Sequence, residues 1–260
     1  MNQVHDMNKL PQITLAFWVM KICATTLGET AGDLLSMTLN VGYAVSSLIL
    51  ISLFAATLVT QLASRRYHPM LYWLVILSTS TAGTTMSDFM DRTLGLGYAM
   101  GSTVLIAILI AVFCAWYASE KSLSVDKITT LKGEVFYWVA ILISNTLGTA
   151  LGDYLADDSG LGFAGGALLM GSAIALVIVL HYTTRLSSIM LFWVAFVLTR
   201  PFGATLGDVL TKSHEKGGLD FGTVGSSAVL LAVLLLLVGL ATYYNRNRKT
   251  AVIDNRLPDS

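Results

Sequence analysis

The chain has 260 residues, of which 55% are hydrophobic and only 12% are charged, and its formal net charge is zero. Soluble domains carry about 25% charged residues, so this composition excludes an ordinary soluble protein. We expect the lipid bilayer as a partner and no nucleic acid.

The apolar residues gather into eight stretches, each long enough for the roughly 20 residues of a membrane-spanning helix. In chain order they cover 12–38, 42–63, 70–90, 94–118, 134–156, 161–182, 188–210 and 221–244. A membrane β-barrel would show alternating segments of about ten residues instead. We therefore predict an all-α integral membrane protein with eight transmembrane helices and little left over for a soluble domain.

One pattern returns four times along these stretches. In each copy an aromatic residue precedes a tryptophan, and an aspartate follows that tryptophan 15 residues later. The pairs are Trp18 and Asp33, Trp73 and Asp88, Trp138 and Asp153, and Trp193 and Asp208. The copies start 55, 65 and 55 residues apart, which predicts four parallel two-helix repeats, arranged as two duplicated four-helix halves.

The repeats divide the chain into four parts. We expect a first transmembrane half at 1–119 (repeats 1 and 2), a cytoplasmic linker at 120–133, a second transmembrane half at 134–245 (repeats 3 and 4), and a cytoplasmic tail at 246–260. A tryptophan in the cytoplasmic aromatic belt would place each aspartate about 22 Å further along its helix, near the opposite boundary of the membrane.

The basic residues outside the spans predict the orientation. One side of the eight-span arrangement carries Arg92, Lys212 and Lys216, and the other carries Lys9, Arg65, Arg66, Lys121, Lys127, Lys132, Arg185, Arg246, Arg248, Lys249 and Arg256. The side richer in arginine and lysine faces the cytoplasm. We therefore expect both termini in the cytoplasm and the protein in a bacterial inner membrane.

Polar side chains follow the aspartates along one face of each odd-numbered helix. Ionisable groups at membrane depth usually mark ion or proton pathways, and hard cations prefer carboxylate and hydroxyl oxygens. We therefore predict a divalent-cation site, with Mn²⁺ as the first candidate ion. Its expected ligands are Asp33, Asp88, Asp153, Asp208, Glu29, Thr30, Thr85, Thr149 and Thr205. The alternative is that each aspartate is an inert, solvated helix end.

Two bases interrupt the polar face. Arg200 takes a polar position in the fourth repeat and is placed to pair with Glu29 or an aspartate, so we assign Glu29 and Arg200 to coupling or gating. Lys21 lies near the tryptophan end of its span, and we expect its side chain to extend to the membrane interface.

Glycines follow the small-xxx-small spacing that lets helix backbones approach closely in lipid. We assign helix packing to Gly28, Gly32, Gly83, Gly148, Gly152, Gly203 and Gly207.

At these residues the chain resembles a bacterial family of multi-pass membrane proteins with repeated T-x-G-x-x-x-G-D segments, and the resemblance covers essentially the whole chain. It is also faintly similar to manganese and calcium exchanger families, whose acidic glycine-aspartate motifs recur on paired helices. Those motifs usually place a base after the aspartate, whereas Asp33, Asp153 and Asp208 are followed by leucine, tyrosine and valine.

The functional expectation is a transporter or channel for a divalent cation, with proton-coupled efflux as one form of it. We expect no cofactor other than the transported ion, and leave a homo-oligomer open. The alternatives are a membrane scaffold or sensor without transport, and an intramembrane enzyme. Intramembrane aspartyl proteases need two non-equivalent acids, so four equivalent aspartates argue against an enzyme.

Overall fold

The computed structural model describes residues 10–64 and 66–254, with side chains as far as Tyr244. Lys9, Arg65 and the side chains of the predicted tail at 246–260 lie outside this range. The described part of the chain contains helices and no strand, in agreement with the predicted all-α class.

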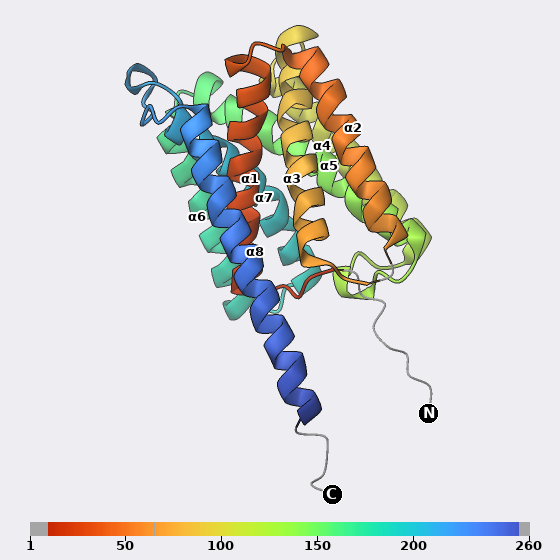
Figure 1. Cartoon of the computed structure of the whole chain (residues 1–260). Helices are drawn as coiled ribbons and strands as arrows, with labels where there is room; N and C mark the ends of the chain where they lie inside the picture. Colours follow the sequence, from red (N-terminus) through yellow and green to blue (C-terminus); the bar gives the residue numbers. More distant parts are fainter. Residues whose placement is uncertain (1–9, 65, 255–260) are drawn as a thin grey trace, which may run out of the picture.

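The eight long helices of this described part are joined by short connections (Figure 1). They are α1 (Leu15–Asp33), α2 (Tyr43–Ala63), α3 (Pro69–Asp88), α4 (Tyr98–Glu120), α5 (Leu131–Asp153), α6 (Gly162–Thr183), α7 (Ser188–Thr211) and α8 (Thr223–Asp254). The helices α1, α3 and α5 each end at a predicted aspartate and continue into a wider helical turn, η1 (Leu34–Thr38), η2 (Phe89–Thr93) and η4 (Tyr154–Asp158). In the fourth repeat α7 runs past its aspartate to Thr211 instead.

Six of these helices are long and apolar enough to cross a membrane, namely α2, α4, α5, α6, α7 and α8. The sequence predicts eight. α1 and α3 are not among the six. α1 carries the charged residues Lys21, Glu29 and Asp33, and α3 is rich in serine and threonine.

The odd-numbered helices form an inner bundle in which α1 packs on α3, α3 on α5, α5 on α7, and α7 on α1. The even-numbered helices lie outside this bundle, with α2 on α3, α4 on α5, α6 on α7 and α8 on α1. Each outer helix therefore covers the inner helix of the following repeat, and α8 returns to the first. α1 begins and α8 ends at the same end of the bundle (Figure 1).

The usual distribution of polarity is reversed in this molecule. Large apolar side chains of the outer helices are exposed, such as Leu48, Leu168 and Val229, while hydroxyl-bearing, amide and charged side chains are buried between the inner helices. Lipid solvates the former, and the latter must find partners within the bundle.

Glycines bring the inner helices together at four equivalent contacts. A Cβ atom added to each of these glycines would lie 2.9–3.1 Å from a backbone carbonyl carbon of the next inner helix. The contacts join Gly28 to Ser80, Gly83 to Asn145, Gly148 to Arg200, and Gly203 to Thr25. Gly32, Gly152 and Gly207 make a second set about one turn away, against Thr84, Ala204 and Glu29.

Aromatic side chains make a second cyclic set of contacts at the end where α1 begins, which we call the tryptophan end. The aromatic residue before each tryptophan packs on the tryptophan of the next repeat, at centroid distances of 5.6–6.1 Å. The pairs are Phe17 with Trp73, Tyr72 with Trp138, Tyr137 with Trp193, and Phe192 with Trp18.

These contacts correct the expected position of the tryptophans. Trp73, Trp138 and Trp193 are at most 5% exposed, so they fill the inside of the bundle instead of forming a belt against the lipid headgroups. The reason is that ring-on-ring packing between repeats turns them inward. Tyr72 and Tyr137 are also buried there, and their hydroxyl oxygens are hydrogen-bonded at 2.7 Å.

Candidate functional site

The four repeat-related aspartates lie at the opposite end of the inner bundle, which we call the aspartate end. Each side chain is almost completely buried, with Asp33, Asp88, Asp153 and Asp208 between 1% and 4% exposed as residues. The structure arranges them as two pairs, each joined by one base.

Arg92 joins Asp88 of α3 to Asp153 of α5. Its Nε lies 3.0 Å from Asp88 Oδ1, and its Nη2 donates to Asp153 Oδ2 at 3.2 Å. Neither Asp88 oxygen has an aligned hydrogen bond within the described chain, so this contact is an ion pair only. Arg92 also donates to the Tyr43 hydroxyl at 3.2 Å and lies against the Tyr98 ring.

Lys212 joins Asp33 of α1 to Asp208 of α7. Its Nζ lies 2.8 Å from Asp33 Oδ2 and 3.1 Å from Asp208 Oδ1. Lys212 follows the last residue of α7 directly, where the backbone turns to an extended conformation. Burial by itself lowers the pKa of Lys212, but the two carboxylates outweigh it and raise the pKa above its ordinary value, so the ammonium is charged.

A buried ion pair between Glu29 and Arg200 lies deeper in the bundle. Arg200 Nη2 is 3.0 Å from Glu29 Oε2, and both side chains are at most 4% exposed. Two threonines complete the contact, because Thr84 and Thr149 each accept a hydrogen bond from Arg200 and donate one to Glu29. The predicted pairing of Arg200 with Glu29 is therefore present in the structure.

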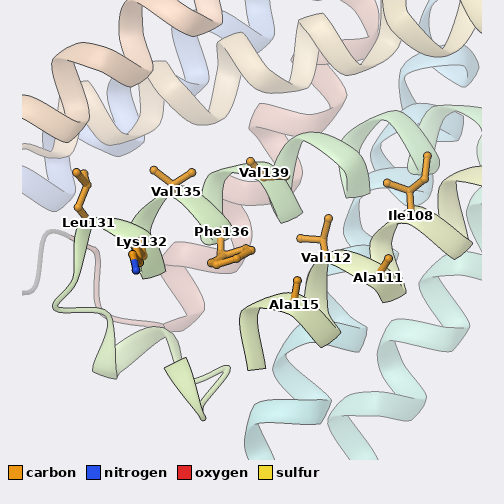
Figure 2. Close-up of a pocket in the computed structure, with 9 residues that line it drawn as sticks. All are labelled: Ile108, Ala111, Val112, Ala115, Leu131, Lys132, Val135, Phe136 and Val139. Carbon is orange, nitrogen blue, oxygen red and sulfur yellow. The ribbon is translucent and has the colours of Figure 1, made fainter. Parts of the chain in front are cut away.

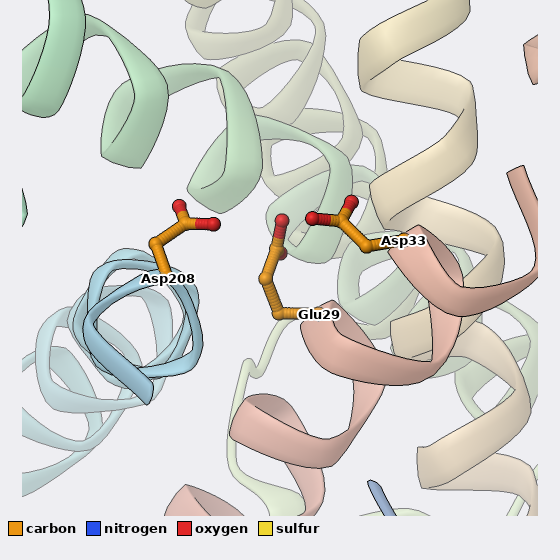
Figure 3. A group of neighbouring side chains, drawn as sticks. All are labelled: Glu29, Asp33 and Asp208. Atoms are coloured by element: carbon orange, nitrogen blue, oxygen red, sulfur yellow. The ribbon is translucent and has the colours of Figure 1, made fainter. Parts of the chain in front are cut away.

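Glu29 also lies close to one of the two aspartate pairs. One carboxylate oxygen from each of Glu29, Asp33 and Asp208 falls within 4.8 Å of the other two. Figure 3 shows the Asp33 and Asp208 carboxyl groups turned toward Glu29 from either side. Asp33 Oδ1 is buried and has no hydrogen-bond partner among the described residues. Three converging carboxylates offer the oxygen ligands that a hard cation uses.

The four predicted threonine ligands are placed differently from one another. Thr149 reaches the Glu29–Arg200 pair, whereas the hydroxyls of Thr30, Thr85 and Thr205 donate to carbonyls of their own helices. Thr30 also accepts a hydrogen bond from Ser227 of α8. Thr84 lies on the polar face of its helix but is not among the predicted ligands. Counting from the tryptophans places it at the level of the ion pair: Glu29, Thr84 and Thr149 all follow their tryptophan by 11 residues, and the other three threonines follow by 12.

The same count locates two bases of the site that were not among its predicted residues. Arg92 and Lys212 follow the aspartates of repeats 2 and 4 by four residues, one helical turn further. Repeats 1 and 3 carry Met37 and Asp157 at this position. Alternate repeats therefore supply the base that each pair of repeats shares.

Lys21 does not extend to the membrane interface as expected. It is completely buried, and its Nζ lies 4.0 Å from the centroid of the Phe196 ring on α7. In the described part of the chain no hydrogen-bond acceptor meets this Nζ. The reason is that α1 packs on α7 at this level, so the side chain lies between the two helices instead of along the outside of the bundle.

An apolar groove lies away from these charged groups, on the outside of α4 and α5. It encloses about 570 Å³ and is lined mostly by aliphatic and aromatic side chains, with Lys132 at its edge (Figure 2). Such a surface suits lipid chains and offers nothing to a charged substrate.

Comparison with known proteins places the chain in a family. Four segments, 16–67, 71–122, 136–187 and 191–247, match the family described as Repeat of Unknown Function (DUF347). These segments start 55, 65 and 55 residues apart, which confirms the repeat spacing predicted from the tryptophans. No curated protein and no solved structure matches the chain, and nothing in these comparisons links it with manganese or calcium exchangers. The chain belongs to the Repeat of Unknown Function (DUF347) family and consists of four copies of its repeat.

Proposed function

We propose that this protein moves a cation across the membrane along the interior of the inner bundle, with Mn²⁺ as the first ion to test. The observation that carries the proposal is the charge of the aspartate end. Within the ion-paired network, five buried carboxylates, those of Glu29 and the four repeat aspartates, face three bases, Arg92, Arg200 and Lys212, so two negative charges are left over in this network.

Uncompensated charge in a low-dielectric environment is costly, so the aspartate end favours cations. A divalent cation or two protons would neutralise it. Because the same carboxylates can bind either a metal ion or protons, we propose that the metal ion is transported in exchange for protons.

The two ends of the bundle support a pathway with one open side. At the aspartate end the side chains of Arg92 and Lys212 are 31% and 22% exposed, so these two bases separate the buried carboxylates from the outside. At the tryptophan end the cyclic aromatic contacts fill the bundle. In an alternating-access cycle this conformation is accessible from the aspartate end and closed at the other.

We further propose that all eight long helices cross the membrane and that both chain ends face the cytoplasm. α1 and α3 are too polar to span on composition alone, and the surrounding apolar helices would shield them. The excess of basic residues on the side of the termini supports the orientation. A reporter enzyme that is active only in the periplasm, fused after Ser260, should stay inactive, and an active fusion would reverse the orientation.

Flux into sealed vesicles containing the purified protein tests the transport proposal. Wild-type vesicles should take up Mn²⁺, and Asp→Asn substitutions, which remove charge at nearly constant size, should abolish uptake at three or more of Asp33, Asp88, Asp153 and Asp208. Asp158→Asn is the matched control, because Asp158 is an exposed acid at the same end of the bundle. Normal uptake by all four variants would show that the aspartates only end helices, and absence of uptake of any tested cation by the wild type would favour a scaffold or sensor.

A further inference from the structure

Resting on the proposed function, we propose that the transported divalent cation binds on one side of the bundle, between α1 and α7, and that Lys212 is a tethered cation that occupies this site until the metal displaces it.

The first support is the set of oxygens between these two helices. Glu29, Asp33 and Asp208 bring three carboxylates within 4.8 Å of one another (Figure 3). Asp33 Oδ1 is buried in this group without a hydrogen-bond partner in the described chain, so one ligand atom is free even while Lys212 is bound. The pair formed by Asp88 and Asp153 has no third carboxylate grouped with it among the described residues.

The second support is the charge balance of the site. Three carboxylates face Arg200 and Lys212, which leaves one negative charge. If the Lys212 ammonium withdraws and a divalent ion takes its place, the three carboxylates are balanced by the ion and Arg200 together. A monovalent ion in the same place would leave one negative charge, so the site favours divalent ions.

The third support is the freedom of Lys212 to leave. Within the described part of the chain its ammonium forms ion pairs with the two aspartates, at 2.8 and 3.1 Å, and its side chain is 22% exposed. Its backbone is fixed, because the Asp220 N–H donates to the Lys212 carbonyl at 3.0 Å. Rotation of the flexible lysine side chain is therefore enough to empty the site, with no movement of α7.

Arg92 is held far more firmly at the other aspartate pair. Its planar guanidinium contacts Asp88 and Asp153 and also the side chains of Tyr43 and Tyr98. An arginine in several simultaneous contacts is harder to displace than the single point charge of a lysine. We therefore assign metal binding to the α1–α7 side and a fixed ion pair to the α3–α5 side.

Equilibrium binding of Mn²⁺ to the purified full-length protein, followed by loss of the electron paramagnetic resonance signal of free Mn²⁺, tests this assignment. Lys212→Met should lower the Kd about tenfold, because a competing charge less than 4 Å from the ligands is removed. Lys212→Arg, which keeps the charge, should not show this gain. Asp33→Asn and Asp208→Asn should raise the Kd at least about tenfold more than Asp88→Asn and Asp153→Asn do.

Each outcome decides something specific. Equal losses at all four aspartates would indicate a single four-carboxylate ring and overturn the inference, while Mn²⁺ flux and the proposed function would stand. Weaker binding by Lys212→Met, with an unchanged unfolding temperature, would make Lys212 a positioning residue and also overturn it. A wild-type protein that neither binds nor transports Mn²⁺, Mg²⁺, Ca²⁺, Co²⁺ or Zn²⁺ would overturn both proposals.

Discussion

The aspartate layer and the neighbouring layer of Glu29, toward the tryptophan end, differ in how similar the four repeats are to one another. At the aspartate layer every repeat has the same residue, whereas four residues nearer the tryptophan end the repeats carry Glu29, Thr84, Thr149 and Ala204. Four like charges cannot all remain ionised cheaply at one depth. The structure separates them into two pairs, each with its own base. The four repeats thus keep the same residue in the aspartate layer, where two bases separate the four charges into pairs. In the next layer their residues differ, and the difference allows one ion pair between Glu29 and Arg200.

The largest effect on stability should come from removing the ion pair between Glu29 and Arg200. Arg200→Met should destabilise the protein by about 3–5 kcal/mol, because it leaves Glu29 buried without its base. Arg92→Met in the aspartate layer should cost only about 1–2 kcal/mol, because solvent reaches Arg92 and the carboxylates can take up protons. Unfolding in mixed detergent and sodium dodecyl sulfate, followed by circular dichroism, measures both.

Glu29→Gln combined with Arg200→Met is the control for this comparison. It removes both charges and should recover part of the loss. Equal costs for the two arginine variants would mean that the two layers are energetically alike.

A smaller effect is expected where the repeats remain alike in their packing. Gly83→Ala should cost about 1–3 kcal/mol, because the new Cβ would lie 2.9 Å from a backbone atom of Asn145, which cannot move aside without parting α3 from α5. Gly239→Ala on α8, where a Cβ meets nothing within 4 Å, should change stability by less than about 0.5 kcal/mol. Similar stability changes for both variants would show that the close glycine contacts do not stabilise the bundle.

The smallest effect concerns the layer beyond Arg200, which Lys21 shares with the equivalent residues Ile76, Ile141 and Phe196. Lys21→Met should stabilise the protein by about 1–2 kcal/mol, because a buried ammonium without a hydrogen-bond partner is replaced by an apolar chain of similar length. Ile76→Met, measured in the same unfolding assay, tests whether methionine alone brings the gain. A destabilised Lys21→Met would show that the bundle needs this charge.

Much of this architecture could be predicted from one repeated spacing in the sequence. The fixed distance from Trp18 to Asp33, repeated four times, gave the correct repeat spacing and helical class. The direction in which the tryptophans point could not be predicted, because an aromatic side chain at a helix end packs equally well against the lipid interface or against a neighbouring ring. Ring contacts between repeats decide it, and those depend on the arrangement of all four.

The site was predicted in part for a similar reason. The sequence left the aspartates as either buried ligands or solvated helix ends, and left Arg200 to pair with either Glu29 or an aspartate. The structure buries the aspartates and pairs Arg200 with Glu29. The roles of Arg92 and Lys212 could not be read in the same way, because the expected span ended before them and charged residues beyond a span are ordinarily solvated. A base one turn after a buried acid was the available signal.

The cyclic order of contacts also has a consequence for how the protein is made. α1 is synthesised first, yet its neighbours α7 and α8 come last, and Arg200 meets the backbone of Thr25 across 175 residues of chain. At about 5–20 residues per second, this interval takes the ribosome roughly 10–35 seconds. During that time Glu29 lacks the arginine that will neutralise it. We therefore expect α1 to remain near the insertion machinery, or to sit only loosely in the bilayer, until the last repeat emerges and closes the ring.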